Sequence, residues 1–196
     1  MRFSTKVTTP PGVRPITVGE ARDYAKVEID DDDSIIDDLI RSSTQWAENY
    51  TRRAFITQTI TMNIDWCFPD VIELPFGQAQ TVTAASFTYV DQNGVTTQVP
   101  TSVYTVDTNS DPGRVYLAFN QLWPTNRMQR DAISIVFVAG YGLKPASLPS
   151  DIRQAVLMMT TYHYETRQPH FLAVGGVPVN MPKTVDALLL PYVIWL

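Results

Sequence analysis

The hydrophobic pattern along the chain changes twice and divides the sequence into three blocks. In residues 34–52, apolar side chains recur every three or four positions, which is the period of an amphipathic helix. In residues 56–141, Thr, Val, Ile, Tyr and Phe are frequent and short alternating runs replace that period, which favours β-strands. The helical period returns after Leu148-Pro149-Ser150-Asp151, where a proline followed by Ser or Asp marks a helix start.

These blocks predict an α+β fold in which the N- and C-terminal blocks form a helical bundle and the middle block is a β-strand-rich insertion. A chain of 196 residues suits one domain and can bury a core without metal ions or disulfide bonds. We expect a single composite domain with an N-terminal helical part at residues 1–55, the β-rich insertion at 56–143, and a C-terminal helix and tail at 144–196.

Local signals mark where several expected elements begin and end. Thr17 and Glu20 stand three residues apart, as in a capping box, and predict the start of a short helix that runs to Val27. Asp91-Gln92-Asn93-Gly94 predicts a hairpin turn, because Asn-Gly tolerates positive φ angles. Ser110-Asp111-Pro112-Gly113 predicts a second turn between two further strands.

Composition indicates an ordinary folded protein. Hydrophobic residues make up 44% of the chain and charged residues 18%. The N-terminus lacks the apolar stretch of a signal peptide, and the longest apolar runs are shorter than the ~20 residues that cross a bilayer. The single cysteine, Cys67, cannot form an internal disulfide and is expected to be a buried small hydrophobic side chain. We expect a soluble protein without a membrane partner.

The charge is unevenly distributed along the chain. The net charge is −5, and seven of the twenty acidic residues lie between Glu28 and Asp38. Basic residues form no stripe, so tight binding to a phosphate backbone is not indicated. The run Asp30-Asp31-Asp32-Asp33 has the oxygen chemistry of a hard-cation site but lacks the spacing of a calcium loop. A solvated loop leading into a helix N-terminus explains the run more simply.

Residues that would carry enzyme chemistry are scarce. The two histidines, His163 and His170, do not have metal-ligand spacing, and His163 falls near the apolar face of the last long helix. The chain contains neither a phosphate-binding glycine loop nor a nucleophile elbow. We therefore expect a protein that is not an enzyme and needs no cofactor or metal ion. Paired carboxylates of a hydrolase remain open, although nothing favours them.

The C-terminal segment is unusual for a chain end. Eleven of the twelve residues from Val185 to Leu196 are uncharged, whereas chain ends are commonly polar. Before Pro191 there is room for about six helical residues, and the run after it favours an extended conformation. Two interpretations are open: the segment packs on its own domain, or it docks on another subunit, for example by adding a strand to a neighbouring sheet.

Short motifs in a characteristic order extend over nearly the whole chain. They are Pro15–Ala21, Asp32–Ile40, Ala47–Ala54, Ile56–Thr59, Ile72–Pro75, Asp111–Arg114, Phe137–Gly142, Leu148–Ala155 and Val185–Tyr192. In this order and spacing the sequence resembles the head–tail connector (adaptor) proteins of tailed bacteriophages and gene-transfer agents. It departs from many relatives by ending Val193-Ile194-Trp195-Leu196 without a final basic residue.

The resemblance implies a virion structural protein of the neck that is assembled in the host bacterial cytoplasm. It implies a homo-oligomeric ring, of 12 copies to match the portal, with a stopper or tail protein on the other side. DNA would pass through the lumen without specific binding. It also implies that the C-terminal segment reaches the portal, so the expected portal-binding residues are Leu188, Leu189, Leu190, Tyr192, Val193, Ile194, Trp195 and Leu196.

Other roles remain open at this point. Asp30, Asp31, Asp32 and Asp33 are candidates for lumen-facing or inter-subunit residues. A stopper-like or tail-completion protein of the same neck is the main alternative to the connector. A carboxylate-dependent hydrolase is a more distant one.

Overall fold

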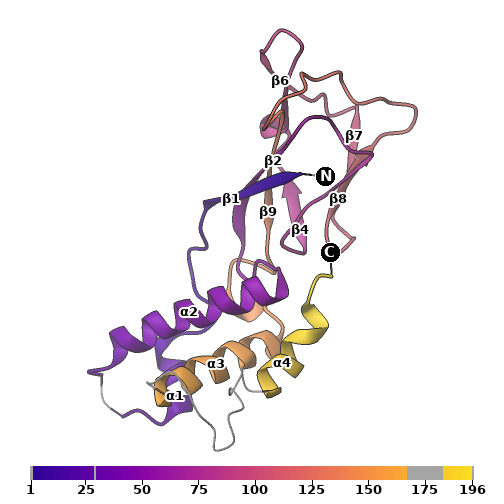
Figure 1. Ribbon diagram of the computed structural model, residues 1–196. Coiled ribbons are helices and arrows are strands. Elements are labelled where there is room, and N and C mark those ends of the chain that lie inside the picture. The colour runs from indigo at the N-terminus through magenta and orange to yellow at the C-terminus, as the bar shows by residue number, and fades with distance from the viewer. Residues whose placement is uncertain (1, 29, 167–182, 196) are drawn as a thin grey trace, which may run out of the picture. The chain divides into compact units, whose positions relative to one another are not determined.

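The computed structural model describes residues 2–28, 30–166 and 183–195, and its contacts group the chain into two compact units (Figure 1). One unit comprises Met1–Pro11 and Thr57–Tyr141 and contains the strands. The other comprises Gly12–Ile56 and Gly142–Leu196 and contains the α-helices. Helices together with antiparallel sheets confirm the predicted α+β class.

Among the described residues of the helical unit, α3 packs against three other α-helices. The helices are α1 (Val18–Ala25), α2 (Asp33–Thr51), α3 (Ser150–Glu165) and α4 (Lys183–Leu189). Short 3-10 turns, η2 (Pro145–Ser147) and η3 (Leu190–Tyr192), precede α3 and follow α4. Apolar side chains at helical spacing build the core of this unit: Ile36, Ile40, Ala47, Ile152, Ala155, Val156, Val185 and Leu189. Among the described residues, no helix is long and apolar enough to cross a membrane.

The ends of α1 and α2 show why these helices begin and stop where they do. The predicted capping box is present, because Thr17 Oγ1 accepts the amide of Glu20 at 3.2 Å and Glu20 Oε2 accepts the amide of Thr17 at 2.8 Å. Helix α2 ends at Thr51, and the capping residue Arg52 adopts a left-handed conformation with φ of 56°. Just beyond it, the Glu48 carboxylate accepts the amide of Phe55 at 2.8 Å and fixes the path of the chain out of the helix.

The strand unit contains a six-stranded and a three-stranded antiparallel sheet. The larger sheet has the order β1-β2-β9-β5-β6, with β4 also paired to β9. Its strands are β1 (Phe3–Thr9), β2 (Gln58–Ile64), β4 (Ala79–Val82), β5 (Thr88–Val90), β6 (Thr96–Gln98) and β9 (Ile133–Ala139). The smaller sheet has the order β3-β8-β7, from β3 (Val71–Glu73), β7 (Tyr104–Asp107) and β8 (Arg114–Leu117). A 3-10 turn, η1 (Ala84–Ser86), precedes β5.

The core of the strand unit lies on one face of the larger sheet. In β2 and β9, alternate residues are buried and the residues between them are half-buried, as the period of two requires. Buried Phe87, next to β5, meets Tyr104 of β7 edge to face with ring centroids 4.9 Å apart. The inner faces of the two sheets therefore share one apolar core.

Three features differ from the sequence-based expectations. The sequence predicts no element in residues 3–9, yet these form β1, which pairs with β2. The nearly continuous apolar run Ala132–Ala139 predicts a strand that is buried on both faces, but the second face of β9 is only half-buried. Cys67 is exposed, so its prediction as a buried residue was wrong. It lies outside the regular strands, directly after Trp66, whose φ is 72°.

Candidate functional site

The C-terminal segment, defined as residues 183–195, packs one side of its helix and part of its tail onto its own unit. Val185 and Leu189 lie one helical turn apart on α4 and are fully buried. Ile194 is buried after the η3 turn. Leu190 and Trp195, in contrast, are 48% and 80% exposed.

Hydrogen bonds attach this segment to the end of α2 and the start of α3. The amide of Ile194 donates to the carbonyl of Thr51 at 3.1 Å, and Arg53 Nε donates to the carbonyl of Tyr192. The Tyr192 hydroxyl donates to Asp151 Oδ2 at 3.3 Å. Partial burial and the Asp151 carboxylate both raise the pKa of Tyr192, so its phenol stays protonated at neutral pH.

The predicted portal-binding residues therefore divide into three groups. Leu189 and Ile194 belong to the core of the helical unit, and Leu188, Tyr192 and Val193 are half-buried. Leu190 and Trp195 are exposed. Leu196 lies outside the described residues.

The acidic run has partners inside its own unit. Arg22 of α1 forms ion pairs with Asp30 and, at 3.4 Å, with Asp33. Asp32 Oδ2 accepts the hydroxyl of Tyr164 at 2.6 Å. The carboxylates also stand at the start of α2, where the helix dipole favours negative charge. Three of the four aspartates thus hold the α1–α2 connection, and Asp31 is exposed.

Glu48 and His163 are partly buried groups with shifted pKa values. Burial raises the pKa of Glu48 to about 7, opposed by the hydrogen bond from the Phe55 amide. Burial lowers the pKa of His163, whose ring meets that of Tyr162 edge to face. In the described ranges, no group of three or more His, Cys, Asp or Glu residues is placed to hold a metal ion. Glu48 closes the end of α2, which is a structural task.

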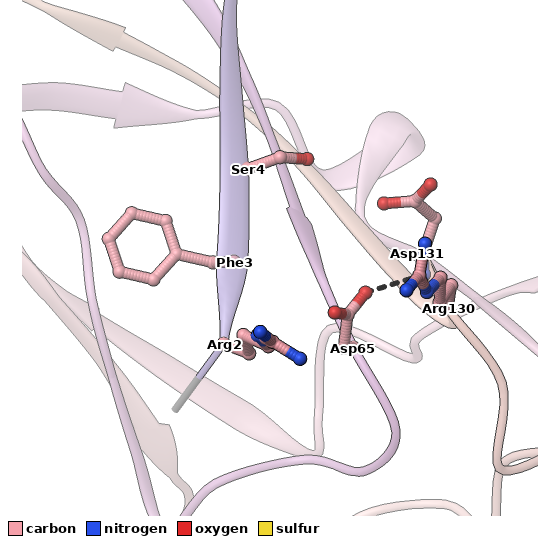
Figure 2. A pocket seen from close by; sticks show the side chains of 6 residues that line it. All are labelled: Arg2, Phe3, Ser4, Asp65, Arg130 and Asp131. Carbon is pink, nitrogen blue, oxygen red and sulfur yellow. Dashed lines mark hydrogen bonds between the residues drawn. The ribbon is translucent and has the colours of Figure 1, made fainter.

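A depression of about 360 Å³ lies where β1 begins beside the end of β2 (Figure 2). Arg2 and Arg130 converge there with Asp65, and the amide of Asp131 donates to Asp65 Oδ1 at 3.0 Å. Phe3 points away from this group, to the other side of β1. Two guanidinium groups and two carboxylates balance each other, so the depression does not have the charge of a phosphate site.

The β8–β9 loop, defined as residues 118–132, was missed as a candidate from the sequence. Phe119 is 99% exposed and Leu122 is 84% exposed, and Met128 is also exposed. Apolar residues in a strand-rich block are usually core, which is why the sequence did not single them out. The signal that was present for Phe119 and Leu122 is their position in residues 119–126, an uncharged stretch with the turn residues Asn120, Pro124 and Asn126.

Comparison with protein-family models decides the kind of protein. Residues 15–193 match the family model described as head completion protein. The chain belongs to the head completion protein family. No curated protein matches it.

Solved structures of similar fold come from gene transfer agent (GTA) particles. A chain in the virion of a native GTA particle is 23% identical, with a TM-score of 0.75, and the match covers 98% of this chain and 96% of that one. A chain in the neck of an empty GTA particle, computed with C6 symmetry, is 23% identical, with a TM-score of 0.74 and coverages of 100% and 97%. A chain in the neck of a native GTA particle, computed with C12 symmetry, is 25% identical, with a TM-score of 0.73 and the same coverages.

These comparisons confirm the predicted resemblance to neck proteins of phage-like particles. The family is described by head completion, and two of the similar chains lie in the necks of GTA particles. Exposed apolar residues, which often mark surfaces for assembly, occur in both units.

Proposed function

We propose that this head completion protein is a head-to-tail connector (adaptor) subunit that forms a ring between the portal and a stopper or tail protein. The observation that carries the proposal is the family match over residues 15–193, together with the similar chain in a neck computed with C12 symmetry. A twelvefold ring follows if this chain repeats in its own particle as that neck does. The particle's genome passes through the lumen of the ring.

The surface chemistry supports a structural ring component. The net charge of −5 and the absence of a basic stripe suit a conduit that lets DNA slide without gripping it. In the finer architecture of this proposal, the helical bundle from the two ends of the chain carries the strand-rich part as an insertion. Exposed Asp31 is a candidate for a lumen-facing or inter-subunit position.

Leu190 and Trp195 are the residues that we assign to portal docking. Both are exposed while their neighbours Leu189 and Ile194 are anchored in the core, so the backbone presents them in a fixed position. A large aromatic side chain on a preorganised support is the usual centre of a binding hot spot. The portal would thus meet a short apolar surface and leave the rest of the C-terminal segment in place.

Reconstitution with the portal protein of the same particle tests the proposal. The purified full chain is mixed with assembled portal, and the mass of the complex is measured by native mass spectrometry. We expect twelve copies of the chain bound to each portal ring. A chain that does not bind the portal but binds the tail-side proteins would be a stopper-like or tail-completion protein. In that case the connector proposal would be wrong. Assembly in the host cytoplasm, ahead of tail attachment, is part of the same proposal.

A further inference from the structure

Strand β1 leaves one edge of the larger sheet open. It pairs with β2 in the described part of the chain, and Asp65 donates its amide to the carbonyl of Arg2 at 3.0 Å. In an antiparallel pair, residues alternate between hydrogen-bonded and non-hydrogen-bonded positions. The main-chain groups of Arg2, Ser4 and Lys6 therefore point to β2. Those of Phe3, Thr5 and Val7 point away from the sheet.

The side chains of these same three residues continue the core face of the sheet. In the register, Phe3 lies opposite Ile64, and Val7 lies opposite Ile60. Ile64 and Ile60 are fully buried, yet Phe3 and Val7 remain 44% and 42% exposed. We call Phe3, Thr5 and Val7 the β1 edge. It combines open main-chain groups with an uncovered apolar strip, which is the kind of edge that proteins normally protect.

The β8–β9 loop presents the opposite situation, with apolar side chains that project from a fixed base. Trp123 stacks on Phe68 with ring centroids 4.8 Å apart. Buried Asn126 donates to the carbonyl of Arg127 at 3.0 Å and accepts a bond from Gln92 at 2.7 Å. The base is thus held by stacking and hydrogen bonds, while Phe119 and Leu122, which precede Trp123, are 99% and 84% exposed. We call Phe119–Leu122 the loop tip.

We propose that the loop tip of one copy packs on the β1 edge of the next copy in the ring. The inference rests on the ring of the proposed function. A ring of identical subunits needs two different surfaces that meet head to tail, and the loop tip and the β1 edge are two such surfaces on the same unit.

The chemistry of the two surfaces matches. Residues 119–126 are uncharged, and so are Phe3, Thr5 and Val7, so their contact desolvates no charge. Packing there covers apolar side chains on both copies, and the loop backbone offers partners to the open main-chain groups of β1. Leu190 and Trp195, on the other unit, are left for the portal.

Disulfide trapping on assembled rings tests the contact. The exposed Cys67 is first removed as Cys67→Ser, and Val7→Cys and Leu122→Cys are then introduced together. A matched control combines Val7→Cys with Val95→Cys, because Val95 is also exposed and lies outside both surfaces. Both proteins are assembled on portal, oxidised and separated on a denaturing gel.

We expect the Val7→Cys/Leu122→Cys protein to form a ladder of linked chains up to the ring number, at least tenfold more than the control. Rings seen by electron microscopy without that ladder, or with equal linking in the control, would overturn the contact and leave the connector proposal standing. If no rings form with or without portal, the connector proposal itself fails, and the contact fails with it.

A second variant tests the same contact without cysteines. Phe119→Asp combined with Leu122→Asp places charges on exposed positions and should leave the thermal unfolding of the monomer unchanged. Ring formation should fall at least tenfold, whereas Val95→Asp should leave it unchanged. Normal rings from the double variant would contradict the proposal.

Discussion

The C-terminal segment and the β8–β9 loop both contain large apolar side chains, with two charged residues of thirteen in the first and three of fifteen in the second, yet they differ in where those apolar side chains lie. The first buries Val185, Leu189 and Ile194 in its own unit. The second leaves Phe119 and Leu122 in solvent. The difference teaches that apolar composition alone does not identify a docking surface. The position of each side chain relative to its anchors does.

The physical cause lies in how each segment is held. Helix α4 presents residues at a spacing of four to the helices beside it, so Val185 and Leu189 reach the core together. In the loop, the stacking of Trp123 and the hydrogen bonds of Asn126 hold the base. The loop tip, which precedes Trp123, keeps Phe119 and Leu122 exposed to solvent. Both segments therefore contain a packed part and a presented part, in different proportions.

The largest expected effect separates two leucines by burial alone. Leu189→Ala removes a fully buried side chain and should lower the free energy of unfolding by about 2–5 kcal/mol. Leu122→Ala, the matched change in the loop, should alter it by less than about 0.5 kcal/mol. Urea unfolding of both variants measures the difference. Similar losses in the two would show that the loop is part of the core after all.

Glu48 lies near the end of α2, to which the C-terminal segment is attached, and it makes the stability of the chain depend on pH. Because burial raises the pKa of Glu48 to about 7, the folded chain holds a proton that the unfolded chain releases near its ordinary pKa of 4.5. This group's contribution to stability is therefore fully present below about pH 4.5 and is lost as the pH rises to about 7. Glu48→Gln keeps an acceptor for the Phe55 amide and should remove this loss, stabilising the chain at pH 8 by at most about 3 kcal/mol.

Unfolding in urea at several pH values between 4.5 and 8 checks the Glu48 prediction. Glu165→Gln, at an exposed position near the end of α3, is the control and should keep the wild-type pH dependence. A Glu48→Gln protein that loses stability with rising pH as the wild type does would exclude Glu48 as the source.

The presented part of the C-terminal segment is expected to matter for binding and not for folding. Trp195→Ala should weaken attachment to the portal about tenfold or more, since exposed aromatic anchors dominate many interfaces. Its free energy of unfolding should stay within about 0.5 kcal/mol of the wild type. Titration of fluorescently labelled chain with portal measures the affinity, and Phe119→Ala provides the comparison. If Phe119→Ala impairs portal binding while Trp195→Ala does not, the roles of the two regions are reversed.

The smallest effect concerns one polar attachment of the C-terminal segment. Tyr192→Phe removes the hydrogen bond to Asp151, which lies at the surface, and should cost less than about 1 kcal/mol. Thermal unfolding detects a change of this size. A loss comparable to that of Leu189→Ala would mean that hydrogen bonds, and not the buried Val185 and Leu189, hold the segment.

Local signals in the sequence were sufficient to predict the elements that short-range interactions determine. The capping box at Thr17 and Glu20 predicted the start of α1, and Asn93-Gly94 predicted the β5–β6 turn, in which Gly94 has φ of 83°. Strand β1 could not be found in this way, because its partner β2 lies more than fifty residues away and its own residues are mostly polar. Its existence depends on a distant pairing.

The same limit applies to the candidate surfaces, because local sequence signals do not show which apolar residues are exposed. The apolar C-terminal segment is visible in the sequence, but the burial of Leu189 and the exposure of Trp195 depend on the helices against which the segment packs. Likewise, the sequence places Phe119 in a strand-rich block, and only the anchors at Trp123 and Asn126 reveal that it projects outward. Tertiary contacts decide which apolar residues are left for partners.

Cryo-electron microscopy of the neck of the particle that contains this chain tests the central claim most directly. The account predicts a ring of twelve copies between the portal and the tail-side proteins, with Leu190 and Trp195 of each copy against the portal. A map in which the chain is absent from the neck, or does not touch the portal, would contradict the claim that it is a head-to-tail connector.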